Sequence, residues 1–339
     1  MASNNQSSAS HFLNPSASAK IANKPRELKQ FEHVIDDLTL VSLYMDLGDL
    51  KKGEGKGKDR LVYTRDTYVR WMAGLARLLN PLVFYTEVPE LRDLLERERS
   101  VVAGRAMTSA RVDLRNRTRA FLFERSTLHS FRHYLPRIRD ILRNPPYPRF
   151  NPNTVVPEYG ATMHAKFDVL ERAIRANYFN SKYFAWIDVG VFRDVGESGV
   201  TAALTIGASL PLRPVAQFGL LLPPQFDERR VASGEVFELN FTLTPEQIVA
   251  HNGVWVCGCM FAAERRVMLR FAEQYAAAVE AMHERALSST DQQVFYSMYT
   301  NTGRSWLPGS PVEVQPFIRD LNHCSMNQWF FFAYLCKEQ

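Results

Sequence analysis

Short, continuous apolar runs in the N-terminal part of the chain predict two buried strands. Residues 38–45 read Leu-Thr-Leu-Val-Ser-Leu-Tyr-Met, and residues 81–86 read Pro-Leu-Val-Phe-Tyr-Thr. Such runs are typical of strands that are buried in a parallel sheet. Between them, Tyr68, Trp71 and Leu75 recur at helical spacing. The pattern therefore predicts a βαβ unit with two parallel strands and a right-handed crossover.

A further helix and strand follow in the middle of the chain. A helical pattern starts at Lys166 and places Phe167 and Leu170 on one stripe. The aromatic and aliphatic run at 183–190 contains Asp188 near its end. Because open α/β sheets bind ligands at the carboxyl ends of their strands, Asp188 is a candidate ligand-binding carboxylate. The alternative is that Asp188 caps the following turn or helix.

The C-terminal third has the same order of strand and helix. Residues 254–261 predict a strand, and the Gly258 inside it marks a bulge or a close approach of a ligand or another backbone. Apolar residues between 267 and 282 then define one face of a long helix.

A capping motif predicts where the next helix begins. Ser289 and Gln292 fit a capping box, which places Asp291 in the first turn of a helix. An acid at this position either complements the helix dipole or presents a carboxylate to a substrate.

The connections between these elements favour one domain. Residues 46–60 are rich in Gly and Lys and predict an exposed loop, and residues 144–160 form a Pro-rich connection. We expect further short strands within 200–222. The alternation of strands and helices predicts a single α/β domain over 35–339, with a mixed, mostly parallel sheet flanked by helices. The Ser- and Asn-rich residues 1–34 lack the apolar segment of a secretory signal and predict a disordered tail.

Composition narrows the class of protein. Hydrophobic residues make up 46% of the 339 residues, yet no apolar run reaches the roughly 18 to 20 residues of a membrane span. The four cysteines, Cys257, Cys259, Cys324 and Cys336, fit neither a disulfide framework nor a zinc site. We therefore expect reduced, structural thiols and a cytoplasmic protein without a transmembrane segment.

The net charge of +5 is concentrated in one region. Residues 92–143 hold 13 arginines and six acids, with aromatic residues between them. Such a segment can bind nucleic acid, an anionic membrane or the phosphates of a substrate, or it can form amphipathic helices with solvated arginines. No nucleic-acid-binding motif accompanies it, so we do not expect nucleic acid as the main partner.

Several of these segments occur in an order that resembles a known family. The segments are Leu40–Tyr44, Tyr68 with the Trp71 helix, Pro81–Tyr85, Lys166, Trp186–Gly190 with Arg193, Gly253–Phe261, and Asp291 with Gln292. In this order, over about residues 38–301, the chain resembles the HtrL/YibB-type family of glycosyltransferase-like proteins.

The resemblance implies a GT-A-like (Rossmann-like) fold and the transfer of a sugar from a nucleotide donor, with a UDP-sugar expected, to a hydroxyl of a glycan or other acceptor. The residues implied to bind the donor are Val41, Ser42, Tyr44, Lys166, Asp188, Gly190, Arg193 and Gly258. The strand from Val41 to Tyr44 would line the base, and Asp188 would meet the ribose or a cation.

The same resemblance implies the catalytic groups. A cation, Lys166 or Arg193 would stabilise the departing nucleoside diphosphate electrostatically. Asp291, with Gln292 beside it, would face the reacting sugar, as a base in an inverting reaction or as a stabilising carboxylate in a retaining one. The catalytic set is therefore Asp291, Gln292 and Lys166.

One departure from the GT-A pattern concerns the metal. Many GT-A enzymes hold Mn²⁺ or Mg²⁺ with an Asp-x-Asp motif, whereas this chain has Asp188-x-Gly190, which removes one oxygen ligand. His323 is the candidate to replace it, so the expected metal ligands are Asp188 and His323. A structural role for His323 is the alternative.

Two other classes of function stay open at this point. A nucleic-acid-binding protein would use the arginine-rich residues 92–143. A catalytically inactive GT-A-like scaffold would bind partners, because Gly190 already interrupts the metal motif.

Overall fold

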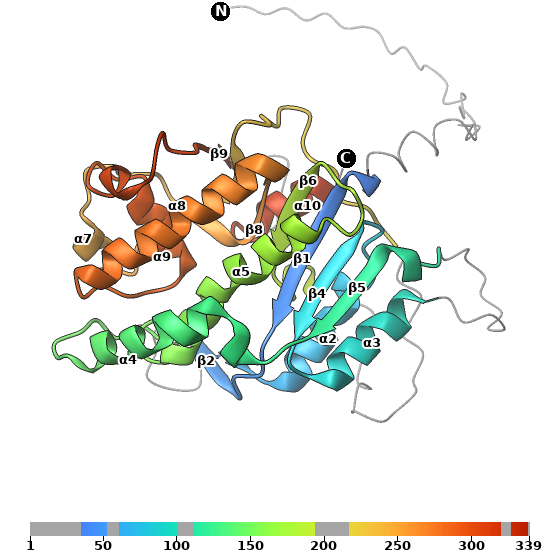
Figure 1. Cartoon of the computed structure of the whole chain (residues 1–339), viewed down its shortest axis with the longest axis horizontal. Helices are drawn as coiled ribbons and strands as arrows, with labels where there is room; N and C mark the ends of the chain where they lie inside the picture. The colour runs from blue at the N-terminus through green and yellow to red at the C-terminus, as the bar shows by residue number, and fades with distance from the viewer. Residues whose placement is uncertain (1–34, 53–60, 101–111, 194–216, 320–326, 338–339) are drawn as a thin grey trace, which may run out of the picture.

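The computed structural model describes residues 35–52, 61–100, 112–193, 217–319 and 327–337 (Figure 1). The strands are β1 Leu38–Tyr44, β2 Leu50–Lys52, β3 Leu61–Tyr63, β4 Leu82–Thr86, β5 Thr118–Leu122, β6 Tyr183–Ile187, β7 Val231–Glu235, β8 Val256–Glu264 and β9 Val314–Phe317. The α-helices are α2 Arg65–Leu75, α3 Pro89–Arg99, α4 Leu135–Arg143, α5 Pro157–Ala176, α7 Pro245–Ala250, α8 Arg265–Glu284, α9 Asp291–Met298 and α10 Phe331–Lys337. Short helical turns are η1 Arg115–Arg117, η2 Arg125–Thr127, η3 Ser130–Tyr134 and η4 Gly303–Trp306.

A seven-stranded sheet forms the centre of the described structure. Its strand order is β5-β4-β1-β6-β8-β7-β9. The pairs β5–β4, β4–β1, β1–β6 and β7–β9 are parallel, whereas β8 is antiparallel to both of its neighbours. Six strands therefore run in one direction and β8 runs in the other. This confirms the predicted mixed, mostly parallel sheet.

Helices cover both faces of this sheet (Figure 1). Alternate residues of a strand point to opposite faces. In β1, Val41 and Leu43 pack into a core with α4, α5, α8 and α9, while Leu38 and Leu40 pack into a second core with α2, α3 and α10. The continuous apolar runs in the sequence arise from this burial on both faces, which confirms flanking helices.

The predicted βαβ unit at the start of the chain is confirmed. α2 joins β1 to β4, and these two strands pair in parallel from Leu40 opposite Leu82 to Tyr44 opposite Thr86. Thr64 caps α2, because its hydroxyl accepts from the backbone N–H of Thr67. The predicted exposed loop at 46–60 is wrong in part, since its residues Leu50–Lys52 form β2 and pair with β3.

Helix α5 begins nine residues before the predicted start. Pro157 occupies its first turn, where a missing backbone N–H costs nothing. The predicted Pro-rich connection therefore ends before residue 157, and Lys166 lies in the middle of the helix. Asn177, in a left-handed conformation with φ 40°, ends it.

The arginine-rich residues are not one basic helical face. Thr118–Leu122 form the edge strand β5, and Arg99 is fully buried. Arg99 donates to Thr118 Oγ1 at 2.7 Å and to the carbonyls of Leu78 and Asn80 at 2.6 and 2.9 Å. Arg99 therefore has a structural role, because it connects the end of α3 to β5 and to the segment before β4.

Other arginines of the same run form ion pairs with acids from distant segments. Arg117 pairs with Asp36, Arg125 with Glu87, Arg137 with Glu280, and Arg139 with Glu158. Their charges are therefore partly compensated by ion pairs, which the alternative of amphipathic helices with solvated arginines did not include.

Two smaller expectations are corrected. The capping box before α9 is formed by Thr290, whose backbone N–H and hydroxyl both donate to Gln293 Oε1, at 3.3 and 2.6 Å, rather than by Ser289 and Gln292. Cys257 and Cys259 form a disulfide instead of two thiols. Residues two apart on a strand share a face, which brings these two side chains together.

Some predictions fall outside the described residues. These concern the tail at 1–34, most of the strands expected within 200–222, Cys324 and His323. The described remainder, 217–222, contains one isolated bridge, between Phe218 and Leu78.

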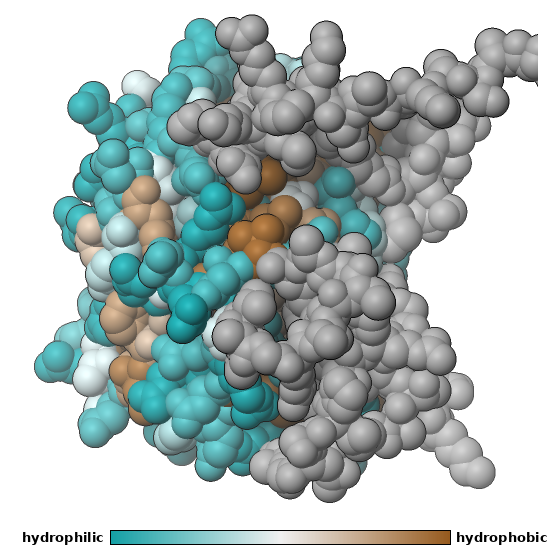
Figure 2. All heavy atoms as spheres, turned by 90° about the vertical axis from the view of Figure 1, so that its right-hand side faces the viewer, coloured by the Kyte–Doolittle hydropathy of each residue, from teal (hydrophilic) through white to brown (hydrophobic). Residues whose placement is uncertain are grey.

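The described surface of one end of the molecule is mostly hydrophilic, with a hydrophobic group of side chains near its centre (Figure 2). Among the helices of the described ranges, none combines the length and the apolar character needed to cross a membrane.

Candidate functional site

The candidate site lies where the order of the parallel strands reverses. β1 is followed along the chain by β4 on one side, while β6 pairs with the other side of β1. The connections therefore leave the carboxyl ends of β1 and β6 in opposite directions, and such a switch point opens a crevice in which α/β proteins bind ligands. A pocket occupies this position, with Tyr44 from the end of β1 and Asp188 after β6 in its lining.

Aromatic rings form one wall of this switch-point pocket. The ring centroid of Tyr68 lies 5.2 Å from that of Tyr44 and 5.1 Å from that of Trp71. Tyr63 packs against Trp71 at 5.2 Å. Burial, followed by the nearby Asp46 carboxylate, raises the pKa of Tyr44 and keeps its hydroxyl protonated. The wall therefore offers the half-buried ring of Tyr68 for stacking and the neutral hydroxyl of Tyr44.

Arg193 brings a positive charge to the same pocket. Its guanidinium lies 4.5 Å from the ring centroid of Trp71 and 4.3 Å from that of Phe330, and Nε donates to the carbonyl of Gly190 at 3.1 Å. Stacking between two rings orients a guanidinium while its other N–H groups face outward. Such a group is suited to bind a phosphate or carboxylate.

A buried ion cluster lies beneath Asp188. Lys166 Nζ contacts Asp188 Oδ1 at 3.1 Å, Asp291 Oδ2 at 2.9 Å and the carbonyl of Gly258 at 3.0 Å. The contacts with Gly258 and Asp291 are hydrogen bonds, and the contact with Asp188 is an ion pair. Burial opposes the charged form, but the two carboxylates outweigh burial, and the pKa of Lys166 is raised. Lys166 is therefore a fixed cation.

The two carboxylates of this cluster differ in exposure. The side chain of Asp188 is 38% exposed and lines the pocket, whereas the side chain of Asp291 is 3% exposed and lies behind Lys166. Trp186 Nε1 also donates to Asp188 Oδ1 at 2.8 Å. One hydrogen bond and one ion pair thus hold the same oxygen of Asp188, which orients the carboxylate toward the pocket.

Two glycines leave space for neighbouring side chains, one at the ion cluster and one at the aromatic wall. A Cβ at Gly258 would overlap the Asp291 carboxylate. A Cβ at Gly190 would lie 2.6 Å from Cε3 of Trp71. The irregularity predicted at Gly258 is confirmed, because the register of β8 with β7 shifts between Phe261 and Val256. The close neighbour of Gly258 is a side-chain carboxylate, not the predicted ligand or backbone. At Gly190, the packing of Trp71 leaves no room for the second acid of an Asp-x-Asp motif.

The described residues do not by themselves fit a divalent-cation site. No group of three His, Cys, Asp or Glu within them is arranged to hold a metal ion. Asp188 is the single carboxylate in the lining of the pocket, and its Oδ1 is already bonded. His323, the other predicted ligand, lies outside the described residues.

The structure brings together some of the predicted site residues and separates others. Lys166, Asp188, Gly258 and Asp291 form the buried cluster, and Tyr44, Asp188, Gly190 and Arg193 line the pocket. Val41 and Ser42 are fully buried within β1 and do not line the pocket. Gln292 is half-buried beside Asp291 and is absent from the pocket lining.

Pocket residues on the first turns of α5 were missed in the sequence. Tyr159, Thr162 and Met163 line the pocket, and with Lys166 they follow the three-and-four spacing of a helix face. The proline-rich residues before them suggested a loop, although Pro157 is a helix-starting signal.

Comparison with protein families gives a match to part of the chain. No curated protein matches the chain. Residues 36–198, just under half of the chain, match the family HtrL_YibB, which is described as "Bacterial protein of unknown function". The matched part runs from before β1 to beyond Arg193, so it contains the pocket residues of β1, α2, α5 and the segment after β6. This match supports, for residues 36–198, the HtrL/YibB family name that the order of sequence segments indicates.

Proposed function

We propose that the protein is a nucleotide-sugar-dependent glycosyltransferase with a GT-A-like fold and that the switch-point pocket binds the nucleotide part of the donor. The observation that carries the proposal is the combination, at one switch point, of an aromatic wall, an oriented carboxylate and a stacked guanidinium. A nucleotide has three matching parts, namely a planar base, ribose hydroxyls and an anionic diphosphate.

Each part of the donor has a partner of suitable chemistry. The ring of the base stacks on the half-buried ring of Tyr68, which Tyr44 and Trp71 support from behind. Asp188 accepts hydrogen bonds from ribose or sugar hydroxyls, and Arg193 binds the diphosphate. The cavity is about 120 Å³, smaller than the roughly 300–1,000 Å³ of whole-ligand sites. It suits one ring of the donor, and the remainder extends outside.

The reaction transfers the sugar to an acceptor hydroxyl. The bond between the anomeric carbon and the diphosphate oxygen breaks, and the nucleoside diphosphate leaves with the electron pair. A new bond forms between the anomeric carbon and the acceptor oxygen, and the acceptor proton is released. Arg193 stabilises the charge that develops on the leaving group. No step is assigned to a metal ion, because the described donor set does not fit one.

The geometry changes the proposed roles of Lys166 and Asp291. Both are buried and bonded to each other, so neither meets the donor directly in this arrangement. We assign them as positioning residues, which fix the Asp188 carboxylate from below. Asp291 would act as a base only if this ion cluster opened.

The proposal is tested with nucleotide binding and turnover. UDP and UDP-sugars should raise the melting temperature by mass action, with about 2.7 kcal/mol of added stability at a concentration 100-fold above Kd. Asp188→Asn should abolish the release of UDP from the UDP-sugar that the wild-type protein uses. The control is Asp140→Asn, which changes an exposed acid on α4. Full donor binding and turnover in Asp188→Asn would remove Asp188 from the site.

A non-catalytic binding protein is the second candidate. It is favoured by the complete pairing of Lys166 with two carboxylates, which leaves no reactive group at the bottom of the pocket. Nucleotide binding without transfer or hydrolysis of any UDP-sugar would support this candidate.

A further inference from the structure

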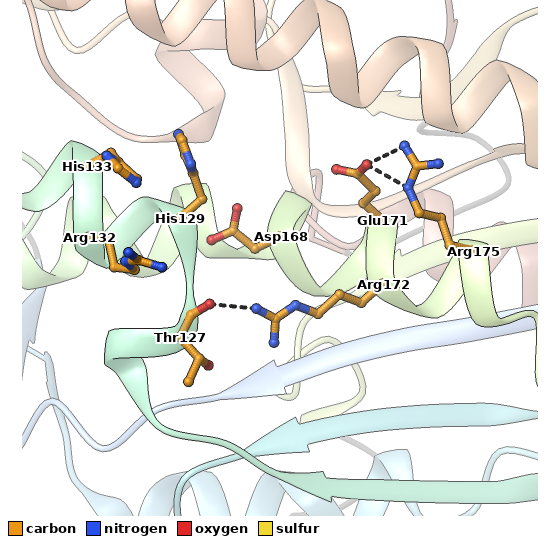
Figure 3. Close-up of a pocket in the computed structure, with 8 residues that line it drawn as sticks. All are labelled: Thr127, His129, Arg132, His133, Asp168, Glu171, Arg172 and Arg175. Atoms are coloured by element: carbon orange, nitrogen blue, oxygen red, sulfur yellow. Dashed lines mark hydrogen bonds and ion pairs between the residues drawn. The ribbon is translucent and has the colours of Figure 1, made fainter.

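A second pocket lies on the side of α5 that faces the segment η2–η3. Its volume is about 280 Å³, which is larger than the cavity at the switch point. Eight residues line it, namely Thr127, His129, Arg132, His133, Asp168, Glu171, Arg172 and Arg175 (Figure 3). None of them lines the switch-point pocket, so the two sites are separate.

The carboxylates of this second pocket are already bonded within the protein. Asp168 Oδ2 accepts from the backbone N–H of Ser130 at 2.9 Å and from its hydroxyl at 2.8 Å. Glu171 Oε1 accepts from Nε and Nη2 of Arg175 at 2.8 and 2.6 Å. Asp168 thus holds the start of η3 against α5, and Glu171 compensates Arg175.

The remaining cations are not compensated in this way. Arg172 Nη2 donates to the carbonyl of Thr127 at 2.6 Å, which leaves its Nε and Nη1 groups for a ligand. Within the described residues, neither Arg132 nor Arg172 forms an ion pair within 4.0 Å. In Figure 3 the two guanidinium groups extend toward the same space from η3 and from α5. The rings of His129 and His133, 4.4 Å apart, lie on the η3 side.

We propose that this pocket binds a small phosphate-bearing anion between Arg132 and Arg172. A guanidinium presents planar N–H forks that match phosphate oxygens, and two such groups can bind one phosphate from two sides. The histidines provide further ring N–H donors. The volume admits a phosphate with a short substituent. The proposal does not depend on the proposed glycosyltransferase activity, because it uses different residues.

The first test measures the affinity of the full-length protein for inorganic phosphate by calorimetric titration. Arg132→Gln and Arg172→Gln should each weaken phosphate binding about tenfold or more, since each removes charged hydrogen bonds. Arg143→Gln on α4, an exposed arginine outside the pocket, should not change the affinity. Phosphate binding that is lost in Arg193→Gln and kept in Arg132→Gln and Arg172→Gln would place the phosphate in the switch-point pocket and overturn the proposal. Absence of phosphate binding, or equal loss in Arg143→Gln, would overturn the proposal.

A second set of variants separates an anion from a cation as the ligand. Glu171→Gln removes a like charge from the rim, so phosphate should bind at least as tightly as in the wild type. Asp168→Asn should have the same effect while its remaining oxygen still accepts from Ser130. Weaker phosphate binding in both variants would mean that the carboxylates, not the arginines, form the site.

The phosphate can belong to a free molecule or to a lipid headgroup. Vesicles of phosphatidylcholine with and without phosphatidic acid distinguish these two sources. Binding to the acidic vesicles that is lost in Arg132→Gln would assign a headgroup. Binding to inorganic phosphate without binding to vesicles would assign a free anion. If the protein binds neither probe, the pocket is not a phosphate site.

Discussion

Lys166 organises the candidate site at the scale of single residues. Its ammonium donates hydrogen bonds to Asp291 and to the carbonyl of Gly258 and forms an ion pair with Asp188, and these partners come from three different segments of the chain. Breaking a buried ion pair is costly, because the remaining charge is left without compensation. The stability of the fold and the orientation of Asp188 therefore depend on the same contacts.

Asp291 should consequently matter more for stability than a helix-capping acid does. An acid that only complements the helix dipole costs about 1 kcal/mol or less when it is replaced. Asp291→Asn removes a buried charge that is paired with Lys166, and we expect it to lower the free energy of unfolding by about 3 kcal/mol. Urea unfolding measures this change, with Asp140→Asn as the exposed control.

A double-mutant cycle tests whether the effect comes from the pair. Lys166→Met should cost less in the Asp291→Asn background than in the wild type, because the shared interaction is lost only once. Additive costs, or a cost of Asp291→Asn below 1 kcal/mol, would show that the contact with Lys166 does not carry the effect.

Gly258 should not accept even one extra carbon atom. The Cβ of alanine would overlap the Asp291 carboxylate, and relief requires that carboxylate to move away from Lys166. We expect Gly258→Ala to lower the free energy of unfolding by about 1–3 kcal/mol, as overpacking of a core does. Thermal or urea unfolding measures it.

Gly160→Ala is the matched control for this prediction. Gly160 lies inside α5, and its nearest neighbour to an added Cβ is 3.7 Å away. Alanine is the better helix former, so this variant should gain roughly 0.5–1 kcal/mol. An equal change in the free energy of unfolding in the two variants would show that the Asp291 carboxylate moves aside at little cost.

Part of this site was predictable from the sequence. The place of Asp188 follows from the strand before it, because a buried apolar run that ends on an acid puts this acid at the sheet edge. The partner of Lys166 did not follow, since Asp291 is 125 residues away and periodicity indicates only which face of an element is buried. Long-range pairing depends on how the helices pack on the sheet.

At the scale of elements, the packing of α5 against α8 buries two histidines. His164 Nδ1 lies 2.6 Å from the Tyr275 hydroxyl, and Tyr134 contacts the rings of both His164 and His283. Burial, followed by the charge of Lys166, lowers the pKa of His164 to about 3. Burial, followed by His164 and Arg137, lowers the pKa of His283 to about 3. Both rings are thus held neutral between the helices.

This burial predicts a loss of stability in acid. The unfolded chain binds protons on histidine near pH 6.5, whereas the folded chain resists protonation down to about pH 3. Between these values the unfolded state binds more protons, so the free energy of unfolding falls as the pH falls. Each histidine contributes a slope of at most about 1.4 kcal/mol per pH unit.

His283→Phe removes one buried titratable group and keeps an aromatic ring in its place. The free energy of unfolding of this variant should therefore fall less steeply as the pH falls. Urea unfolding at several values between pH 7 and pH 5 measures the slope, and His251→Phe, which changes an exposed residue at the end of α7, serves as the control. An unchanged acid slope in His283→Phe would mean that other groups cause the loss.

The sequence predicted elements with clear periodicity better than elements with mixed signals. β1, β4, β6 and α8 follow from apolar patterns. β5 did not, because Thr118–Leu122 is an edge strand within an arginine-rich run, and Thr118 is its one buried residue. The early start of α5 was also missed, since proline both interrupts a helix and favours its first turn.

At the scale of the whole molecule, strand order creates the switch point. The parallel pairing of β1 with β4 follows from a short crossover, and this part was predictable. The position of the antiparallel β8 between β6 and β7 was not predictable. Its paired residues are 73 to 81 positions from those of β6 and 21 to 30 positions from those of β7. The pocket exists only when β1 and β6 are neighbours, so its full lining could not be assembled from local patterns.

The charges gathered at this switch point predict that donor binding does not require a divalent cation. Trp71 fills the space that a second acid at position 190 would need, and Lys166 already supplies a fixed positive charge to Asp188. Arg193 supplies the positive charge that faces the pocket. We therefore expect UDP to raise the melting temperature equally in EDTA and in Mn²⁺, and to lose about tenfold or more in affinity in Arg193→Gln. The contrary result would be that Mn²⁺ strengthens UDP binding to the wild-type protein but not to His323→Ala. That result would support the metal site of Asp188 and His323 that the sequence predicts.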